Sequence, residues 1–166
     1  MPTASRPSEH TLVTSEDAEA VWFSGCLALI KASTESTGGA LALVEFTHPP
    51  DFATPPHIHH HEDEAFYILE GTMSGFCGDQ QWRATAGDFV WLPRGVVHGY
   101  AIEGDQPLRT LAICLPTGFE SFVRDAGEPA GERELPPSAE FDVPKLLASA
   151  AQHGQEILAA PAAPTV

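Results

Sequence analysis

The sequence is poor in basic side chains. It has 8 lysine and arginine residues against 23 aspartate and glutamate residues, which gives a formal net charge of -15. A surface this acidic repels the phosphates of nucleic acids and of anionic lipids. The chain also lacks the roughly 18 to 20 consecutive apolar residues of a membrane span and the roughly 7 to 15 of a secretory signal. We therefore expect a soluble protein with neither nucleic acid nor a membrane as a partner.

Cysteine is scarce as well. Cys26, Cys77 and Cys114 are odd in number, widely separated and without a Cys-x-x-Cys pair. This pattern gives no sign of a disulfide framework, and a structural zinc site built on cysteines is disfavoured. A reduced setting fits these thiols best, so we expect a cytoplasmic protein.

Short β-like runs separated by glycine and proline turns dominate the middle of the chain. The 166 residues suit one domain, and no internal repeat is visible. Residues 1–20 are polar and aperiodic and predict an N-terminal arm, whereas residues 21–117 predict an all-β sandwich or barrel. The expected strands are 26–32, 40–47, 64–70, 72–77, 89–92, 96–102 and 109–115, and the first two would form a hairpin.

The pattern changes after Pro116, where residues 118–158 predict a helical extension. Thr117-Gly-Phe-Glu120 resembles a capping box that opens a short helix ending at Gly127. Asp142 can cap a second helix, with Pro144 in its first turn and its end near Gly154. Residues 159–166 contain mostly alanine and proline and predict a disordered tail.

Histidines are concentrated around residues 57–61, and one more lies at position 98. On an extended chain His57 and His59 place two imidazoles on one face. Glu64 is an odd number of residues beyond His59, so a turn or bulge must separate them. Together with His98 these residues suit one divalent transition metal (Fe, Mn, Ni, Co, Cu or Zn) better than calcium or magnesium. Such a metal would keep free positions for water, substrate or dioxygen.

Two stretches resemble the metal-binding motifs of the cupin superfamily. Residues 56–71, Pro-His-Ile-His-His-His-Glu-Asp-Glu-Ala-Phe-Tyr-Ile-Leu-Glu-Gly, resemble the first motif, and residues 87–98, Gly-Asp-Phe-Val-Trp-Leu-Pro-Arg-Gly-Val-Val-His, resemble the second. The resemblance implies a double-stranded β-helix, or jelly-roll barrel. The short C-terminal helices predicted above lie outside the part of the chain that it covers. Its one departure is Ile102, where the second motif usually continues to asparagine. The ligands that it implies are His57, His59, Glu64 and His98.

Within the superfamily, the first motif is similar to that of small bacterial proteins grouped with quercetin 2,3-dioxygenases. This implies a metal-dependent oxygenase that acts on an enolic or phenolic small molecule and dioxygen, with Glu64 accepting the substrate's proton. Glu64 as a plain ligand remains an alternative, as does a metal that only stabilises the barrel. Rival functions are a non-redox isomerase, lyase or polyketide cyclase and a non-catalytic ligand-binding protein. The resemblance also implies a homodimer.

Alternation along the strands suggests residues that contact the substrate. Phe66 and Ile68 share the face of Glu64, and Tyr100 shares that of His98. These three side chains either line a substrate pocket or belong to the barrel core. His60 and His61 are interpreted as solvated residues beside the ligands.

Overall fold

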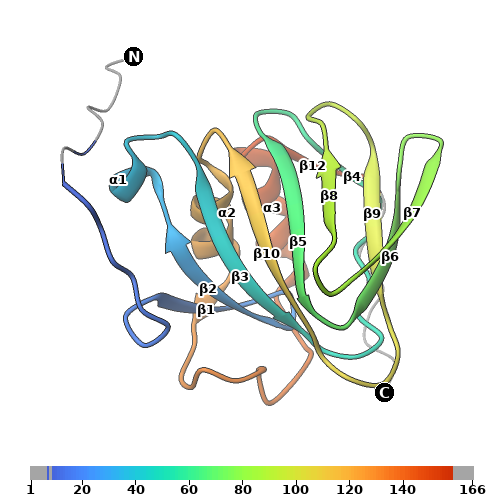
Figure 1. Ribbon diagram of the computed structural model, residues 1–166, viewed down its shortest axis with the longest axis horizontal. Coiled ribbons are helices and arrows are strands. Elements are labelled where there is room, and N and C mark those ends of the chain that lie inside the picture. The colour runs from blue at the N-terminus through green and yellow to red at the C-terminus, as the bar shows by residue number, and fades with distance from the viewer. Residues whose placement is uncertain (1–6, 8, 159–166) are drawn as a thin grey trace.

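Two antiparallel sheets face each other in the computed structural model, which describes residue 7 and residues 9–158 (Figure 1). The seven-stranded sheet has the order β11-β1-β2-β3-β10-β5-β8, and the five-stranded sheet has the order β12-β4-β9-β6-β7. The strands of the first sheet are β1 (Glu19–Phe23), β2 (Cys26–Ala32), β3 (Ala42–His48), β5 (Asp63–Glu70), β8 (Phe89–Leu92), β10 (Leu108–Leu115) and β11 (Glu128–Pro129). Those of the second are β4 (His57–His59), β6 (Thr72–Cys77), β7 (Gln80–Thr85), β9 (His98–Glu103) and β12 (Gln155–Ile157).

Strict alternation of side chains gives the seven-stranded sheet a buried inner face. Burial alternates at every residue along β3 and β10, as a period of two requires. The register places Val44, Ala112, Phe66 and Val90 in one row across four strands. Burying side chains of the size of Val44 or Phe66 stabilises the fold by about 1.5 to 3 kcal/mol each. The core therefore lies between the sheets, where the inner faces meet.

Two helices cover the part of the barrel interior that the smaller sheet leaves open. They are α2 (Phe119–Ala126) and α3 (Val143–Gln152), which lie behind β3 and β10 in Figure 1. The ring of Phe122 on α2 meets that of Phe23 on β1 edge-on, with 5.2 Å between centroids. None of the described helices has the length and hydrophobicity of a bilayer span.

The all-β class and the short C-terminal helices are confirmed, with local differences. Strands β2 and β3 pair as the predicted hairpin, but their connection contains the short helix α1 (Thr34–Thr37). Asp142 caps α3 as predicted, and its carboxylate accepts from the Lys145 N–H at 2.9 Å. Helix α2 is capped by Gly118 rather than Thr117. Gly118 has no side chain to cap the helix, and the Glu120 carboxylate accepts from its N–H at 2.8 Å.

The C-terminal extension also contains a strand that the sequence pattern did not reveal. After α3, Gly154 at φ 72 turns the chain into β12, and a Cβ at this position would collide with the His61 ring. β12 pairs with β4, with Gln155 opposite His59. Three residues are too short to show a period in sequence, which is why the strand was missed. The predicted tail, residues 159–166, lies outside the described residues.

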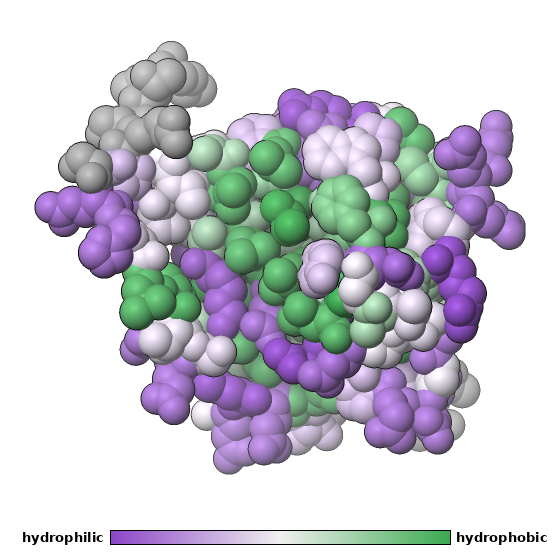
Figure 2. Space-filling view, in the orientation of Figure 1, coloured by the Kyte–Doolittle hydropathy of each residue, from purple (hydrophilic) through white to green (hydrophobic). Residues whose placement is uncertain are grey.

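The outer face of the seven-stranded sheet carries an apolar surface. One row across β3, β10, β5 and β8 places Leu43 beside Ile113, Ala65 and Trp91, and the next row places Leu111 beside Tyr67 and Phe89. Tyr67, Phe89 and Trp91 are 40%, 58% and 49% exposed. Figure 2 shows hydrophobic side chains gathered over these strands with polar ones around them.

Candidate metal centre

The four predicted ligands come from both sheets and converge between them. His57 on β4 lies directly opposite His98 on β9, and Glu64 near the start of β5 belongs to the facing sheet. Ligand atoms from His57, His59, Glu64 and His98 all lie within 4.8 Å of one another. Glu64 Oε2 is 3.4 Å from His98 Nε2 and 3.7 Å from His59 Nε2. The fold thus brings together residues that are 41 positions apart in sequence, from 57 to 98.

The change of sheet between His59 and Glu64 accounts for their odd spacing. β4 ends at His59 and β5 begins at Asp63, so residues 60–62 form the break that the sequence required. Asp63 is fixed at its end of β5 because its carboxylate accepts from the Arg94 backbone N–H at 2.9 Å and from Arg94 Nη2 at 2.7 Å. The carboxylate of Glu64 is therefore directed inward by a strand whose start is anchored.

Backbone carbonyls orient two of the imidazoles. His57 Nδ1 lies 2.8 Å from the Pro55 carbonyl, and His98 Nδ1 lies 2.9 Å from the Val96 carbonyl. A carbonyl oxygen can only accept, so each Nδ1 carries the hydrogen. In the neutral ring the lone pair is then on Nε2, which is the tautomer that can ligate a metal at the centre of the cluster.

Glu62 and Gln155 lie behind the third imidazole, that of His59, and were not identified from sequence. Glu62 is 1% exposed, and its Oε1 lies 3.4 Å from His59 Nδ1. Gln155 on β12 donates a hydrogen bond from Nε2 to the same carboxylate oxygen. The Phe119 ring stacks on His59 at 5.6 Å with an interplanar angle of 25°. A carboxylate behind a ligating histidine is the usual outer support of a metal site.

The polar atoms at the centre of the cluster fit a bound cation. Glu64 Oε2 and His98 Nε2 are buried and have no hydrogen-bond partner among the described residues. A buried acceptor without a partner costs about 1 to 3 kcal/mol. A divalent ion shared by these atoms would remove that cost. The donor set of three imidazoles and one carboxylate suits a transition metal.

The ionisation of these groups also favours metal binding. Burial by itself raises the pKa of Glu64, but the nearby His59, His98 and His57 lower it to about 2. Burial lowers the pKa of His57 to about 4, helped by the neighbouring imidazoles. Burial acts in the same direction on the pKa of His98, but the Glu64 carboxylate more than offsets it and the net shift is upward. Glu64 is thus ionised and His57 neutral near pH 7, whereas protons compete with a metal at His98.

A cavity of about 580 Å³ opens beside the cluster. Two of the predicted substrate residues, Phe66 and Tyr100, line it together with His57, His59 and Glu64. Ile68 does not belong to this lining. It is fully buried one step further along the same face of β5, in the core of the barrel. The other aromatic walls are Phe23, Phe46, Phe52, Phe119, Phe122 and Phe141.

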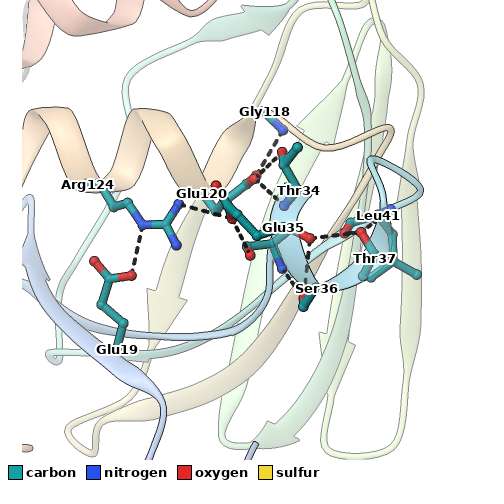
Figure 3. A network of polar contacts seen from close by, with 10 residues as sticks. Glu19, Thr34, Glu35, Ser36, Thr37, Leu41, Gly118, Glu120 and Arg124 are labelled. Atoms are coloured by element: carbon teal, nitrogen blue, oxygen red, sulfur yellow. Dashed lines mark hydrogen bonds and ion pairs between the residues drawn. The ribbon is translucent and has the colours of Figure 1, made fainter. Parts of the chain in front are cut away.

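A buried carboxylate joins α1 to the start of α2 and so holds one wall of this cavity (Figure 3). Glu120 is 0% exposed, and its Oε1 accepts from the Thr34 backbone N–H at 2.8 Å and from Thr34 Oγ1 at 2.7 Å. Its Oε2 accepts from the Gly118 N–H at 2.8 Å. These bonds place the neighbouring Phe119 against His59.

The structure is an antiparallel β-barrel of two sheets, and three histidines and one glutamate cluster between them. The protein therefore belongs to the class of β-barrels whose interior could hold one metal ion. Residues 44–114 match the family model described as the cupin domain. This match assigns residues 44–114, the part of the barrel that carries the four-residue cluster, to the cupin superfamily.

Individual relatives are distant. Over 100 residues the chain is 30% identical to the quercetin 2,3-dioxygenase of Bacillus subtilis (strain 168), a match that covers 60% of this chain and 29% of that protein. The chain therefore spans less than a third of this curated relative. Among solved structures, KdgF from Halomonas sp. superposes with a TM-score of 0.59 at 17% identity, over 68% of this chain and 99% of the other. The polyketide cyclase RemF from Streptomyces resistomycificus superposes with a TM-score of 0.55 at 24% identity, over 64% and 80%. These two likenesses show the fold.

Proposed function

We propose that the protein is a metal-dependent oxygenase acting on an enolic or phenolic small molecule, with one divalent transition metal held by His57, His59, Glu64 and His98. The observation that carries this proposal is the convergence of four ligand atoms within 4.8 Å at the wall of an apolar, aromatic cavity. When bound, such a metal acts as a Lewis acid and, if redox-active, couples the substrate to dioxygen. The resemblance to a quercetin 2,3-dioxygenase supports the choice of an oxygenase.

Glu64 is the residue that we assign to proton transfer. Its pKa of about 2 makes the carboxylate a weak base, so it suits only a hydroxyl that has already been acidified by coordination. Its two oxygens allow one to remain a ligand while the other accepts the proton. Phe66 and Tyr100 would hold the substrate rings against this carboxylate, and the aromatic walls would exclude water from it.

Dependence on dioxygen tests the reaction type. For the metal-loaded protein with a panel of flavonols and other enols, we expect substrate loss to be matched by oxygen uptake and to fall at least about 100-fold under argon, since dioxygen is a reactant. Oxygen electrode traces and chromatography of the same samples measure both quantities. Readmitting air should restore the rate, which controls for inactivation. Turnover that continues without oxygen would contradict the oxygenase assignment.

A non-redox reaction is the second candidate, and the donor set is the observation that favours it. Three histidines and a glutamate also suit zinc, which polarises a carbonyl without redox chemistry. The polyketide cyclase RemF shares the fold. Under this alternative an isomerase, lyase or cyclase would act in the same cavity, and turnover would be unaffected by argon. A ligand-binding cupin would bind the same compounds without turnover.

We also propose a homodimer formed through the outer face of the seven-stranded sheet. The chain as a whole is strongly acidic, with a net charge of -15, but the two rows of the outer face that contain Trp91 and Tyr67 are apolar. Glu45 lies at one end of the row of Tyr67. Two copies related by a twofold axis could cover these rows without opposing their charged surfaces. The Arg109 side chain at the edge pairs with Glu45 and Glu70, which leaves the centre of the face uncharged.

A charge placed on this face should separate the copies. We expect light scattering to give twice the chain mass for the wild type and the single mass for Trp91→Glu at micromolar concentration, because a buried unpaired carboxylate costs several kcal/mol. Gln81→Glu is the matched control, since it adds the same charge on an exposed position of β7. A monomeric wild type, or a dimeric Trp91→Glu, would overturn this proposal.

The three cysteines support a proposal about the compartment. All are free thiols, and Cys26 and Cys114 are buried. Burial raises the pKa of both thiols well above the usual range, so they stay protonated and inert. We propose a reducing compartment, the cytoplasm, as the setting of this protein.

A further inference from the structure

A second polar group borders the cavity, and no metal ligand belongs to it. His48 is the last residue of β3, and its Nε2 lies 3.0 Å from the hydroxyl oxygen of Tyr100 on β9. The pair therefore bridges the two sheets. Both side chains line the cavity, and His48 is 1% exposed. The ring centroids of Phe52 and Phe46 lie 4.9 Å and 5.4 Å from that of His48, so the pair is surrounded by apolar walls.

The second nitrogen of His48 has no partner. Its Nδ1 is buried and makes no hydrogen bond within the described part of the chain. Buried polar atoms are paired in the great majority of cases, so an unpaired one at a cavity wall requires an explanation. A ligand in the cavity could supply the missing partner. The neighbouring rings cannot, because Phe46 and Phe52 carry no polar atom.

Counting hydrogens shows what the pair offers to a ligand. Burial lowers the pKa of His48 to about 3, so the imidazole is neutral and carries one N–H. Tyr100 carries one O–H. One of these two hydrogens is used in the bond between them, and the other remains free on Nδ1 or on the hydroxyl. Whichever tautomer is present, the pair keeps one free donor, and both of its side chains line the cavity.

The position of the pair sets the size of the ligand. Tyr100 follows His98 by two residues on the same face of β9, a step of about 7 Å along the strand. His48 lies across the gap between the sheets, with its Nε2 3.0 Å from the Tyr100 hydroxyl oxygen. A molecule that contacts both the metal ligands and this pair must therefore extend past a single ring. Between the two ends it would lie against Phe66, whose ring is 5.1 Å from that of Tyr100.

We propose that His48 and Tyr100 are the specificity-determining pair of the cavity, and that the ligand is a multi-ring aromatic molecule carrying an acceptor oxygen, a hydroxyl or carbonyl, on the ring farthest from the metal ligands. This proposal rests on the proposed function in one respect only, which is that the opposite end of the ligand lies at the histidine cluster. The free donor of the pair binds that distal oxygen. A ligand without it leaves the donor unpaired and binds less tightly.

Two flavonol probes that differ only in the distal hydroxyl test the pair. They are 3-hydroxyflavone and 3,4′-dihydroxyflavone, titrated by fluorescence into the zinc-loaded full-length protein under argon, so that binding is measured without oxidation. The wild type should bind the dihydroxy compound at least about tenfold more tightly. His48→Phe/Tyr100→Phe should bind both probes with similar affinity. Equal affinities for the wild type, or no binding of either probe, would overturn the proposal.

Two further measurements separate specificity from a structural role. Replacing both polar partners by apolar rings of similar shape leaves no unpaired group, so the double variant should keep the melting temperature of the wild type. A large fall in melting temperature with an unchanged affinity ratio would show that the pair only stabilises the barrel. Phe52→Leu is the matched control, since it alters a wall of the cavity and should weaken both probes equally.

The outcome is independent of the reaction type. If the wild type distinguishes the probes but consumes no oxygen with either, the oxygenase assignment fails and the binding pair stands. If oxygen is consumed equally well with both probes and their affinities are equal, the pair has no role in specificity and the oxygenase assignment stands.

Discussion

His98→Ala is expected to weaken the binding of a divalent transition metal by at least about 100-fold, more than the loss of a typical outer-shell partner. His98 supplies an Nε2 that lies 3.4 Å from Glu64 Oε2, and its Nδ1–H is held by the Val96 carbonyl. Alanine removes the ligand and leaves a space that only water can fill. Metal analysis after dialysis, followed by competition with a chelator, measures the change in affinity. Oxygen-dependent turnover should be lost with the metal.

His60→Ala is the matched control for this experiment. His60 directly follows a predicted ligand in sequence, but its side chain is 47% exposed and its Nε2 is 2.7 Å from Glu156 on β12. We expect this variant to retain the metal affinity of the wild type. If His98→Ala kept a full complement of metal while His60→Ala lost it, the assignment of the ligands would be wrong.

Glu120→Ala is expected to lower the free energy of unfolding by about 2 to 4 kcal/mol, because it leaves two partly buried backbone N–H groups and one partly buried hydroxyl without their acceptor. The two N–H groups belong to Thr34 and Gly118, and the hydroxyl is that of Thr34. Urea unfolding followed by circular dichroism measures the difference, with the slope of the transition compared between variants. Phe119 should also lose its fixed position against His59, so metal affinity should fall with stability.

Two further variants serve as comparisons for Glu120→Ala. Glu120→Gln keeps the shape of the side chain and one acceptor oxygen, so it should be destabilised less than Glu120→Ala. Glu128→Ala removes a carboxylate from an exposed position of β11 and should change stability by less than about 0.5 kcal/mol. Equal stability of Glu120→Ala and the wild type would mean that the network in Figure 3 does not hold α1 to α2.

The ligand cluster was predictable because its signal is local. His57 and His59 alternate on one short strand, and the odd spacing to Glu64 required a break that the structure places at residues 60–62. Strand pairing then brings His98 opposite His57. The resemblance of residues 56–71 and 87–98 to the two cupin motifs indicates the same four residues.

Residues whose surroundings depend on contacts between distant parts of the chain could not be placed correctly from sequence. Glu62 belongs to a polar run that looks solvated in sequence, yet β12 covers it and Gln155 donates to it. His48 ends an apolar strand with no motif around it, and it becomes important only where Tyr100 approaches from the other sheet. Ile68 shares the face of Glu64, but it is buried in the core instead of bordering the cavity. The alternation of side chains along a strand predicts which face of the sheet a residue occupies. It does not predict which part of that face borders a cavity.

The chain by itself determined the all-β class and the helix that Asp142 caps, because each follows from the spacing of neighbouring residues. The four candidate metal-binding positions followed from the alternation of His57 and His59 together with the resemblance to the two cupin motifs. Only the tertiary structure decided that Glu62 stands behind His59, that Phe119 stacks on it, and that His48 and Tyr100 form a second polar group in the cavity. Those arrangements depend on which strands pair and where β12 and α2 pack against the barrel. Such contacts join residues far apart in the chain, and no local pattern encodes them.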